Sequence, residues 1–221
     1  MTRAGSKRRI RWWWIVLAAI VVALIPVALI VVPIVTHTNQ GQSGQADAGP
    51  GWPTDVTATG DDGRTRSFDV LSAEAGASAA SSQLDTSALA EGDRLVVSGT
   101  GYDPSRGIYV AICKIPETAG GKPGPCIGGV PEQEGASSVG AVDYAPSNWI
   151  NDDWAWKLLG ARSFDDRDAG TFTAYIEVGP PVSDELDCTV SECGVFTRND
   201  HTALSDRAQD LYVPVRFAAA G

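Results

Sequence analysis

A stretch without any charged side chain, residues 12–35, constrains this chain more than any other feature. As an α-helix rising about 1.5 Å per residue it would be roughly 36 Å long, enough to cross a hydrocarbon core of about 30 Å. Pro26 and Pro33 would disturb a soluble helix, but membrane helices tolerate proline better. The stretch therefore predicts one transmembrane helix.

The flanking residues predict the orientation of that helix. Residues 1–11 contain five basic residues and no acidic one. The positive-inside rule keeps such a tail in the cytoplasm, and Trp12, Trp13 and Trp14 are typical of the aromatic belt at the headgroups. We therefore expect a single-pass protein of the cell membrane with residues 36–221 outside the cytoplasm.

The alternative interpretation of this segment is a cleaved signal peptide. Signal peptides have an apolar core of about 7–15 residues followed by a small-residue cleavage site. Here the apolar core is longer, and residues 33–37 contain no A-x-A pattern. These two differences favour an uncleaved signal-anchor.

The segment after the apolar stretch predicts a flexible linker over residues 36–55. It is rich in Gly, Gln, Ser and Pro and shows no apolar period. Residues 56–221 are then long enough for one extracytoplasmic domain with a core of its own.

Alternation of apolar and polar residues dominates that domain. In residues 171–178 every second residue is apolar, and residues 211–217 repeat the pattern. Pro214 cannot donate to a ladder, so the last strand is expected to have a free edge. Shorter runs follow the same rule at 56–59, 67–71, 94–98 and 108–113, and 189–197 is a further strand candidate. Short strands and frequent turns predict an all-β sandwich.

One short helix is expected among these strands. Asn151 can cap it, Asp152 and Asp153 suit its first turn, and Lys157 and Gly160 suit its end.

Four cysteines lie on the side expected to be extracytoplasmic: Cys113, Cys126, Cys188 and Cys193. An even number in an oxidising compartment suggests two disulfides. Three pairings are possible, and the spacing favours the local bridges Cys113–Cys126 and Cys188–Cys193. Zinc is the alternative, but the spacing is not that of a finger and no histidine clusters with the cysteines.

The segment 187–195, DCTVSECGV, resembles the DCT-x-x-x-C-x-V segment of the neocarzinostatin-type apoproteins. Residues 92–101 and 108–113 are similar to that family's first core strands and first cysteine. The ending over 197–217 is similar to membrane-anchored actinobacterial cell-surface proteins with the same domain. The resemblance implies an immunoglobulin-like sandwich of about seven antiparallel strands with two local disulfides and a ligand-sized cleft. It does not carry over the enediyne ligand or any chromophore-contacting residue.

The charge balance excludes one class of partner. Beyond residue 11 the chain has 12 basic and 27 acidic residues, a formal net charge of −15. Such a surface repels phosphate backbones, so no nucleic-acid partner is expected. The charge suits either simple solubility or a basic partner.

Three tryptophans within eight residues are the candidate ligand-binding residues: Trp149, Trp154 and Trp156, with Tyr144 nearby. Clustered aromatic residues suit a carbohydrate, an aromatic ligand or a protein partner. The alternative is that they pack over the open end of the sandwich.

Other polar groups predict turns rather than chemistry. Asp200, His201 and Ser205 lie close in sequence, but there is no G-x-S-x-G elbow. The run 197–210 is expected to hold the last hairpin together through Arg198, Asp200, Arg207 and Asp210. Acidic residues at 152–153 and 165–168 do not match the EF-hand pattern, so no metal site is predicted.

Together these features predict a non-enzymatic, membrane-anchored binding domain at the cell surface, with no cofactor. Its partner would be a surface protein, a cell-wall glycan or a small hydrophobic ligand. The second hypothesis is a carrier of a small hydrophobic ligand, with haem suggested only by the company of the resembling family. The third is a hydrolase.

Overall fold

The computed structural model describes residues 6–46, 51–73, 85–128 and 143–218. The chain divides into two compact units, Met1–Thr38 and Asn39–Gly221. The second unit begins at Asn39, whereas the predicted linker extends to residue 55. Residues 1–5 of the predicted basic tail and residues 47–50 of the predicted linker lie outside the described residues.

The first unit contains helix α1 (Ser6–Val35). Residues Trp12–Val32 are long and apolar enough to cross a membrane, which suits an anchor or a signal sequence. The helix begins six residues before the predicted span, so half of the expected basic tail is helical. Most of its described apolar side chains, among them Trp13 and Val22, are exposed.

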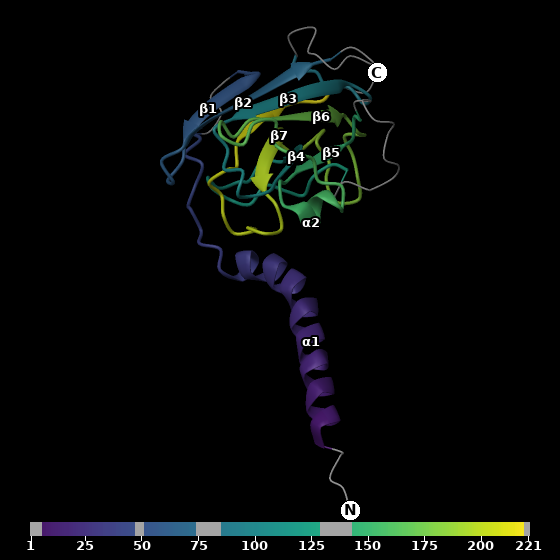
Figure 1. Ribbon diagram of the computed structural model, residues 1–221. Helices are drawn as coiled ribbons and strands as arrows, with labels where there is room; N and C mark the ends of the chain where they lie inside the picture. Colours follow the sequence, from purple (N-terminus) through teal and green to yellow (C-terminus); the bar gives the residue numbers. More distant parts are fainter. Residues whose placement is uncertain (1–5, 47–50, 74–84, 129–142, 219–221) are drawn as a thin grey trace, which may run out of the picture. The chain divides into compact units, whose positions relative to one another are not determined.

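The second unit is an antiparallel β-sandwich of two four-stranded sheets, which form the two layers in Figure 1. The first sheet contains, in spatial order, β1 (Asp55–Thr59), β2 (Thr65–Ser72), β3 (Arg94–Thr100) and β6 (Phe172–Glu177). The second contains β5 (Ser147–Ile150), β4 (Ile108–Lys114), β7 (Cys193–Asn199) and β8 (Tyr212–Val215). The described residues thus form eight strands instead of about seven. The pairs β3–β6 and β4–β7 give the connectivity of an immunoglobulin-like sandwich.

The core confirms the two alternating patterns. Phe172, Ala174, Ile176 and Val178 are buried, as are Leu211, Val213, Val215 and Phe217. Side chains of alternate residues point to opposite faces of a strand, so each run contributes one apolar face between the sheets. Pro214 lies on β8, which is an edge strand as expected.

Strand β5 was not predicted, because all four of its residues are buried and alternation is therefore absent. The side chain of Asn148 on β5 hydrogen-bonds the backbone of β6 in the facing sheet, where a neighbouring strand would otherwise pair. The Asn148 amide donates to the Tyr175 carbonyl at 2.9 Å, and its oxygen accepts from the Tyr175 N–H at 3.1 Å. A polar side chain thus links β5 to β6 on one side of the sandwich.

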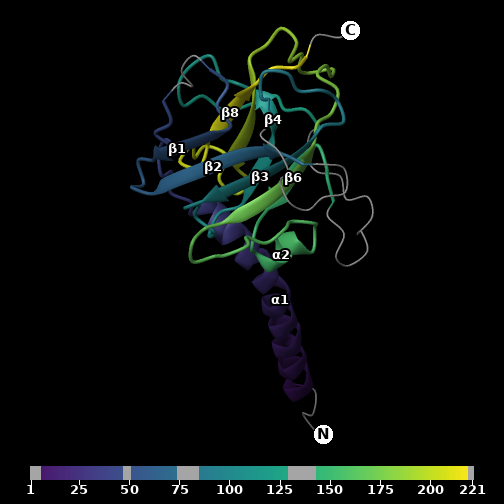
Figure 2. The same ribbon diagram turned by 90° about the horizontal axis from the view of Figure 1, so that it is seen from above.

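The strands end in two groups of loops at opposite ends of the sandwich (Figure 2). The disulfide end holds residues 114–128 and 179–192, with the bridges Cys113–Cys126 and Cys188–Cys193, which confirms both expected pairings. The network end holds the loops 101–107, 151–171 and 200–211, named for the polar contacts described below.

Residues 39–46 are part of the sandwich, so the prediction of a flexible linker is wrong for them. The side-chain amide of Gln45 donates to the Tyr212 carbonyl and accepts from the Tyr212 N–H, both at 2.8 Å. The Arg207 N–H also donates to the Gly41 carbonyl at 3.0 Å. The side chain of Gln45 therefore satisfies the backbone groups of β8 that a neighbouring strand would otherwise pair with. The composition of the segment does not reveal this role.

Candidate functional site

Four aromatic rings gather at the network end; we call Tyr109, Trp149, Trp156 and His201 the aromatic cluster. Tyr109 and Trp149 are paired residues on β4 and β5, with ring centroids 5.9 Å apart. Trp156 lies 5.7 Å from Trp149, and His201 lies 4.6 Å from Trp156 in an edge-to-face contact. The cluster joins two strands, one helix and one turn.

Helix α2 (Trp154–Lys157) supplies Trp156. Its N-cap is Asp153, whose carboxylate accepts from the Ala155 N–H at 2.8 Å, and not Asn151 as predicted. Asn151 lies one step earlier, where its side-chain oxygen accepts from the Asp153 N–H at 2.8 Å. The helix therefore begins two residues later than a cap at Asn151 would place it.

The buried carboxylate of Asp200 holds the aromatic cluster in place through a hydrogen bond to Trp149. Its Oδ2 accepts from the indole N–H of Trp149 at 2.9 Å and from the Asn151 amide at 2.8 Å. Its Oδ1 accepts from the N–H and the hydroxyl of Thr202, at 2.9 and 2.5 Å. A Cβ at Gly107 would lie 1.9 Å from Oδ2, so only glycine leaves room for this carboxylate. Four donors compensate the desolvation of a buried charge.

His201 occupies the space among the other rings. Its Nδ1 lies 2.9 Å from the Tyr109 hydroxyl, and its ring is 5.4 Å from that of Trp149. Burial raises the pKa of Tyr109 to about 12, and the charge of Asp200 adds to the rise. Tyr109 is therefore a neutral phenol at physiological pH. The side chains of the aromatic cluster themselves occupy the space between its rings.

Among the described residues, the side chains of Asp200 and His201 are hydrogen-bonded to different partners. Asp200 bonds Trp149, Asn151 and Thr202, while His201 bonds Tyr109. The Ser205 carbonyl accepts from Asn39 at 2.9 Å.

The structure brings two of the four predicted ligand-binding residues into direct ring contact. Trp149 and Trp156 belong to the aromatic cluster, and Trp149 is only 9% exposed. Trp154 is 53% exposed. Tyr144 lies elsewhere, edge-on to Tyr175 at 5.5 Å and beneath the Arg94 guanidinium at 4.9 Å.

Sequence reasoning missed Tyr109, and it gave Asp200 and His201 no binding role. Alternation in β4 does place Tyr109 on the face away from the core residues Ile108 and Val110. No pattern shows that β4 pairs with β5, because β5 does not alternate. The cluster follows from that pairing.

Large apolar side chains are exposed beside the cluster, and we call Trp154, Leu158, Leu159 and Leu204 the apolar rim. Leu158 is 74% exposed, and the other three are between 52% and 55% exposed. Leu204 follows His201 in the same turn, and the two other leucines follow α2 directly. Grouped exposed apolar residues mark interaction surfaces more often than scattered ones do.

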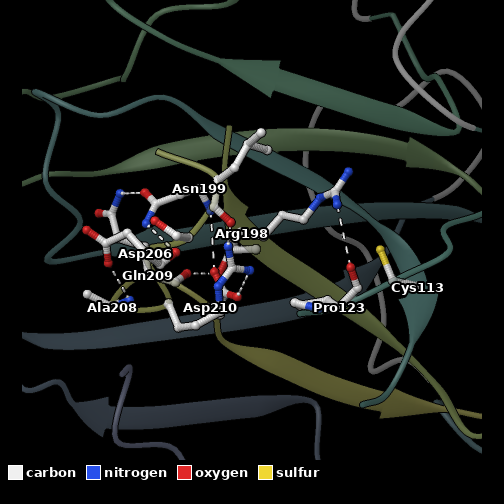
Figure 3. A network of polar contacts seen from close by, with 12 residues as sticks. Cys113, Pro123, Arg198, Asn199, Asp206, Ala208, Gln209 and Asp210 are labelled. Atoms are coloured by element: carbon white, nitrogen blue, oxygen red, sulfur yellow. Dashed lines mark hydrogen bonds and ion pairs between the residues drawn. The ribbon is translucent and has the colours of Figure 1, made fainter. Parts of the chain in front are cut away.

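A buried polar network supports the turn that carries Leu204 (Figure 3). The Asn199 amide donates to the Asp206 carbonyl at 3.0 Å, and the Gln209 amide donates to Asn199 Oδ1 at 2.9 Å. Arg207 pairs with Asp210 at 2.7 Å. Burial raises the pKa of Asp210 to about 7, against the opposing effect of Arg207.

Arg198 was expected in the same network but points away from it in Figure 3. Its guanidinium donates to the Pro123 carbonyl at 3.5 Å and lies 5.5 Å from the centre of the Tyr109 ring. The expected group therefore divides, and only Arg207 and Asp210 form a direct ion pair.

A polar recess of about 330 Å³ lies near the disulfide end and contains none of the candidate tryptophans. It is lined by Ala73, Gly92, Asp93, Arg94 and Glu177. Arg94 and Glu177 pair across it at 3.1 Å. The recess and the aromatic cluster are separate features.

The turn predicted at the acidic residues 165–168 is observed. Asp166 Oδ1 accepts from the N–H groups of Asp168 and Ala169, and Asp165 accepts from the Thr173 hydroxyl at 2.8 Å. Asp152 pairs with Lys157 and Arg167.

Comparison with protein-family models, with curated proteins and with solved structures finds no match.

Proposed function

We propose that this chain is a membrane-anchored, extracytoplasmic binding domain without enzymatic activity, held at the cell surface by α1. The apolar rim is the observation that carries the proposal. It exposes four large apolar side chains at the network end of the sandwich. Large apolar side chains that are exposed in the free protein gain free energy when a partner removes their surface from water.

The contacts of Asp200 and His201 support binding over catalysis. The carboxylate has four donors, and the imidazole is bonded to a phenol whose pKa is raised. Groups held in this way orient the neighbouring rings of the aromatic cluster. In this proposal the aromatic cluster supports the segments that carry the apolar rim.

The extracytoplasmic location is supported by two independent features. Both pairs of cysteines are joined, and structural disulfides persist in oxidising compartments. An apolar helix of membrane-spanning length precedes the domain. An immunoglobulin-like sandwich with two local disulfides also suits the neocarzinostatin-like, actinobacterial cell-surface family that the sequence resembles.

Lysine accessibility in intact cells tests the topology. A membrane-impermeant amine reagent should modify Lys122 and Lys157 and leave Lys7 unmodified until the cells are opened. The chain should retain α1 and stay with the membrane fraction. A mature N-terminus after Val35, or equal modification of Lys7, would contradict the anchor.

Photo-crosslinking tests the rim as the binding surface. A photoreactive residue in place of Leu159 should give adducts in intact cells. The same residue in place of Val190 is the matched control, because Val190 is 82% exposed at the disulfide end. Equal adducts at both positions would contradict binding through the rim.

A further inference from the structure

The connection between α1 and the sandwich is short. The helix ends at Val35, and Asn39 is the first residue of the second unit. Four residue steps span at most about 14 Å even when fully extended. If α1 crosses the membrane, as proposed above, the point where the chain joins the domain stays close to the outer headgroups.

That point belongs to the network end of the sandwich. The Asn39 amide donates to the Ser205 carbonyl at 2.9 Å, and the Gln40 N–H donates to Asp206 at 3.1 Å. The same turn carries His201, whose ring contacts Trp156, and Leu204 of the rim. The short connection and the apolar rim are thus on one end of the domain.

The side chains of the rim suit a lipid interface. Tryptophan prefers the headgroup level of a bilayer, and leucine gains free energy when its surface leaves water. The nearby cations Lys157 and Arg167 are both paired with Asp152, at 3.3 and 3.0 Å. Attraction to anionic headgroups therefore contributes little, and the contact would be apolar.

We propose that the apolar rim inserts into the boundary between headgroups and acyl chains of the outer leaflet. The partner of this surface is then the bilayer that holds α1, and the domain lies against the membrane by its network end. This inference rests on the proposed anchor and names the partner of the same surface.

The disulfide end provides an internal control. Val182 and Val190 are exposed there by 51% and 82%. Strand β7 has seven residues, and at about 3.3 Å each it separates the two ends by roughly 20 Å. Exposure alone would give both ends the same access to lipid, whereas insertion of the rim favours one.

Photoreactive lipid provides the test. The full chain is reconstituted in phosphatidylcholine vesicles that contain a phosphatidylcholine with a diazirine near the glycerol end of one acyl chain. After illumination, tryptic peptide 158–162 should carry at least about fivefold more lipid than peptide 168–198, which contains Val182 and Val190. Equal labelling of these two peptides would overturn the inference and leave the rim for a protein or glycan.

Two variants separate insertion from simple exposure. The double variant Leu158→Ser/Leu159→Ser should also lower the labelling of peptide 199–207, which contains Leu204, because the whole rim would leave the bilayer. Val190→Ser should leave that labelling unchanged. Both variants change exposed side chains, so folding is retained, and an intact mass with two disulfides confirms it. Unchanged labelling of peptide 199–207 in the double variant would overturn the inference.

The peptide that contains α1, residues 12–64, distinguishes this inference from the proposed anchor. Labelling of that peptide without labelling of the rim would leave the anchor in place and reject only the insertion. Absence of label from both would reject the anchor as well.

Discussion

The two ends of the sandwich are stabilised by different means. The disulfide end is closed by two covalent bridges, which link residues 13 and 5 positions apart. The network end has no cysteine and is closed by buried carboxylates and amides, chiefly Asp200, Asp206 and Asp210. Covalent bridges depend on the redox state, whereas buried polar groups depend on each having its partner and on pH.

The largest expected effect comes from Asp200→Ala. This change leaves the buried indole N–H of Trp149 and the Asn151 amide without an acceptor, and should lower the free energy of unfolding by roughly 3–5 kcal/mol. Thermal unfolding of the full chain in detergent, followed by near-ultraviolet circular dichroism, measures it. Asp165→Ala is the control, because its single bond to Thr173 is exposed, and it should change little. Equal effects would mean that the network end does not depend on Asp200.

Removal of the disulfides comes next. Replacing Cys113 and Cys126 by Ala should cost about 3 kcal/mol, and replacing Cys188 and Cys193 about 2 kcal/mol, because the longer loop gains more entropy in the unfolded state. The same unfolding measurement checks both. A larger loss for the shorter loop would show that loop entropy is not the main contribution.

A pH effect should distinguish the two ends further. Because the pKa of Asp210 is raised to about 7 in the folded state, its folded form keeps a proton that the unfolded chain loses near pH 4. Stability should therefore fall by roughly 2 kcal/mol as pH rises from about 4.5 to 7.5. Arg207, Arg198 and Tyr102 are the charged or titratable groups that act on Asp210.

Unfolding of wild type and Asp210→Asn at several pH values isolates this contribution. Asp210→Asn should show a smaller fall in stability above pH 4.5 than the wild type. The double Cys188→Ala/Cys193→Ala variant should show the same fall as the wild type. Asp62 and Asp187 have lowered pKa values, so their contributions are lost only at more acidic pH. A wild type whose stability rises over this range would contradict the assignment to Asp210.

The smallest expected effect concerns the segment that precedes the sandwich. Gln45→Ala removes both bonds to the Tyr212 backbone and should cost about 1 kcal/mol. Hydrogen exchange of the Tyr212 amide should become faster. Gln40→Ala is the control, because its side-chain oxygen has no hydrogen-bond partner among the described residues. Unchanged exchange in Gln45→Ala would show that the segment does not protect β8.

Much of the sandwich could be predicted from its apolar alternation, and much of the candidate site could not. The strands of Phe172 and Val213 can be recognised in the sequence, because apolar residues on one face alternate with less buried residues on the other. Asn148 and Gln45 instead use side-chain amides where backbone groups would normally pair, so their segments lack any periodic signal. Tyr109 and Trp149 meet only through the pairing of β4 with β5, which is a non-local contact.

The pairing of Gln45 with the edge strand β8 affects how neighbouring copies of the chain can associate. Molecules confined to a membrane, as proposed here, meet each other far more often than molecules in solution, and an unpaired strand edge would let them join sheet to sheet. Gln45 occupies the Tyr212 backbone, and Pro214 offers no N–H for a new ladder. If α1 is the anchor proposed above, the segment that follows it also acts against aggregation in the plane of the membrane.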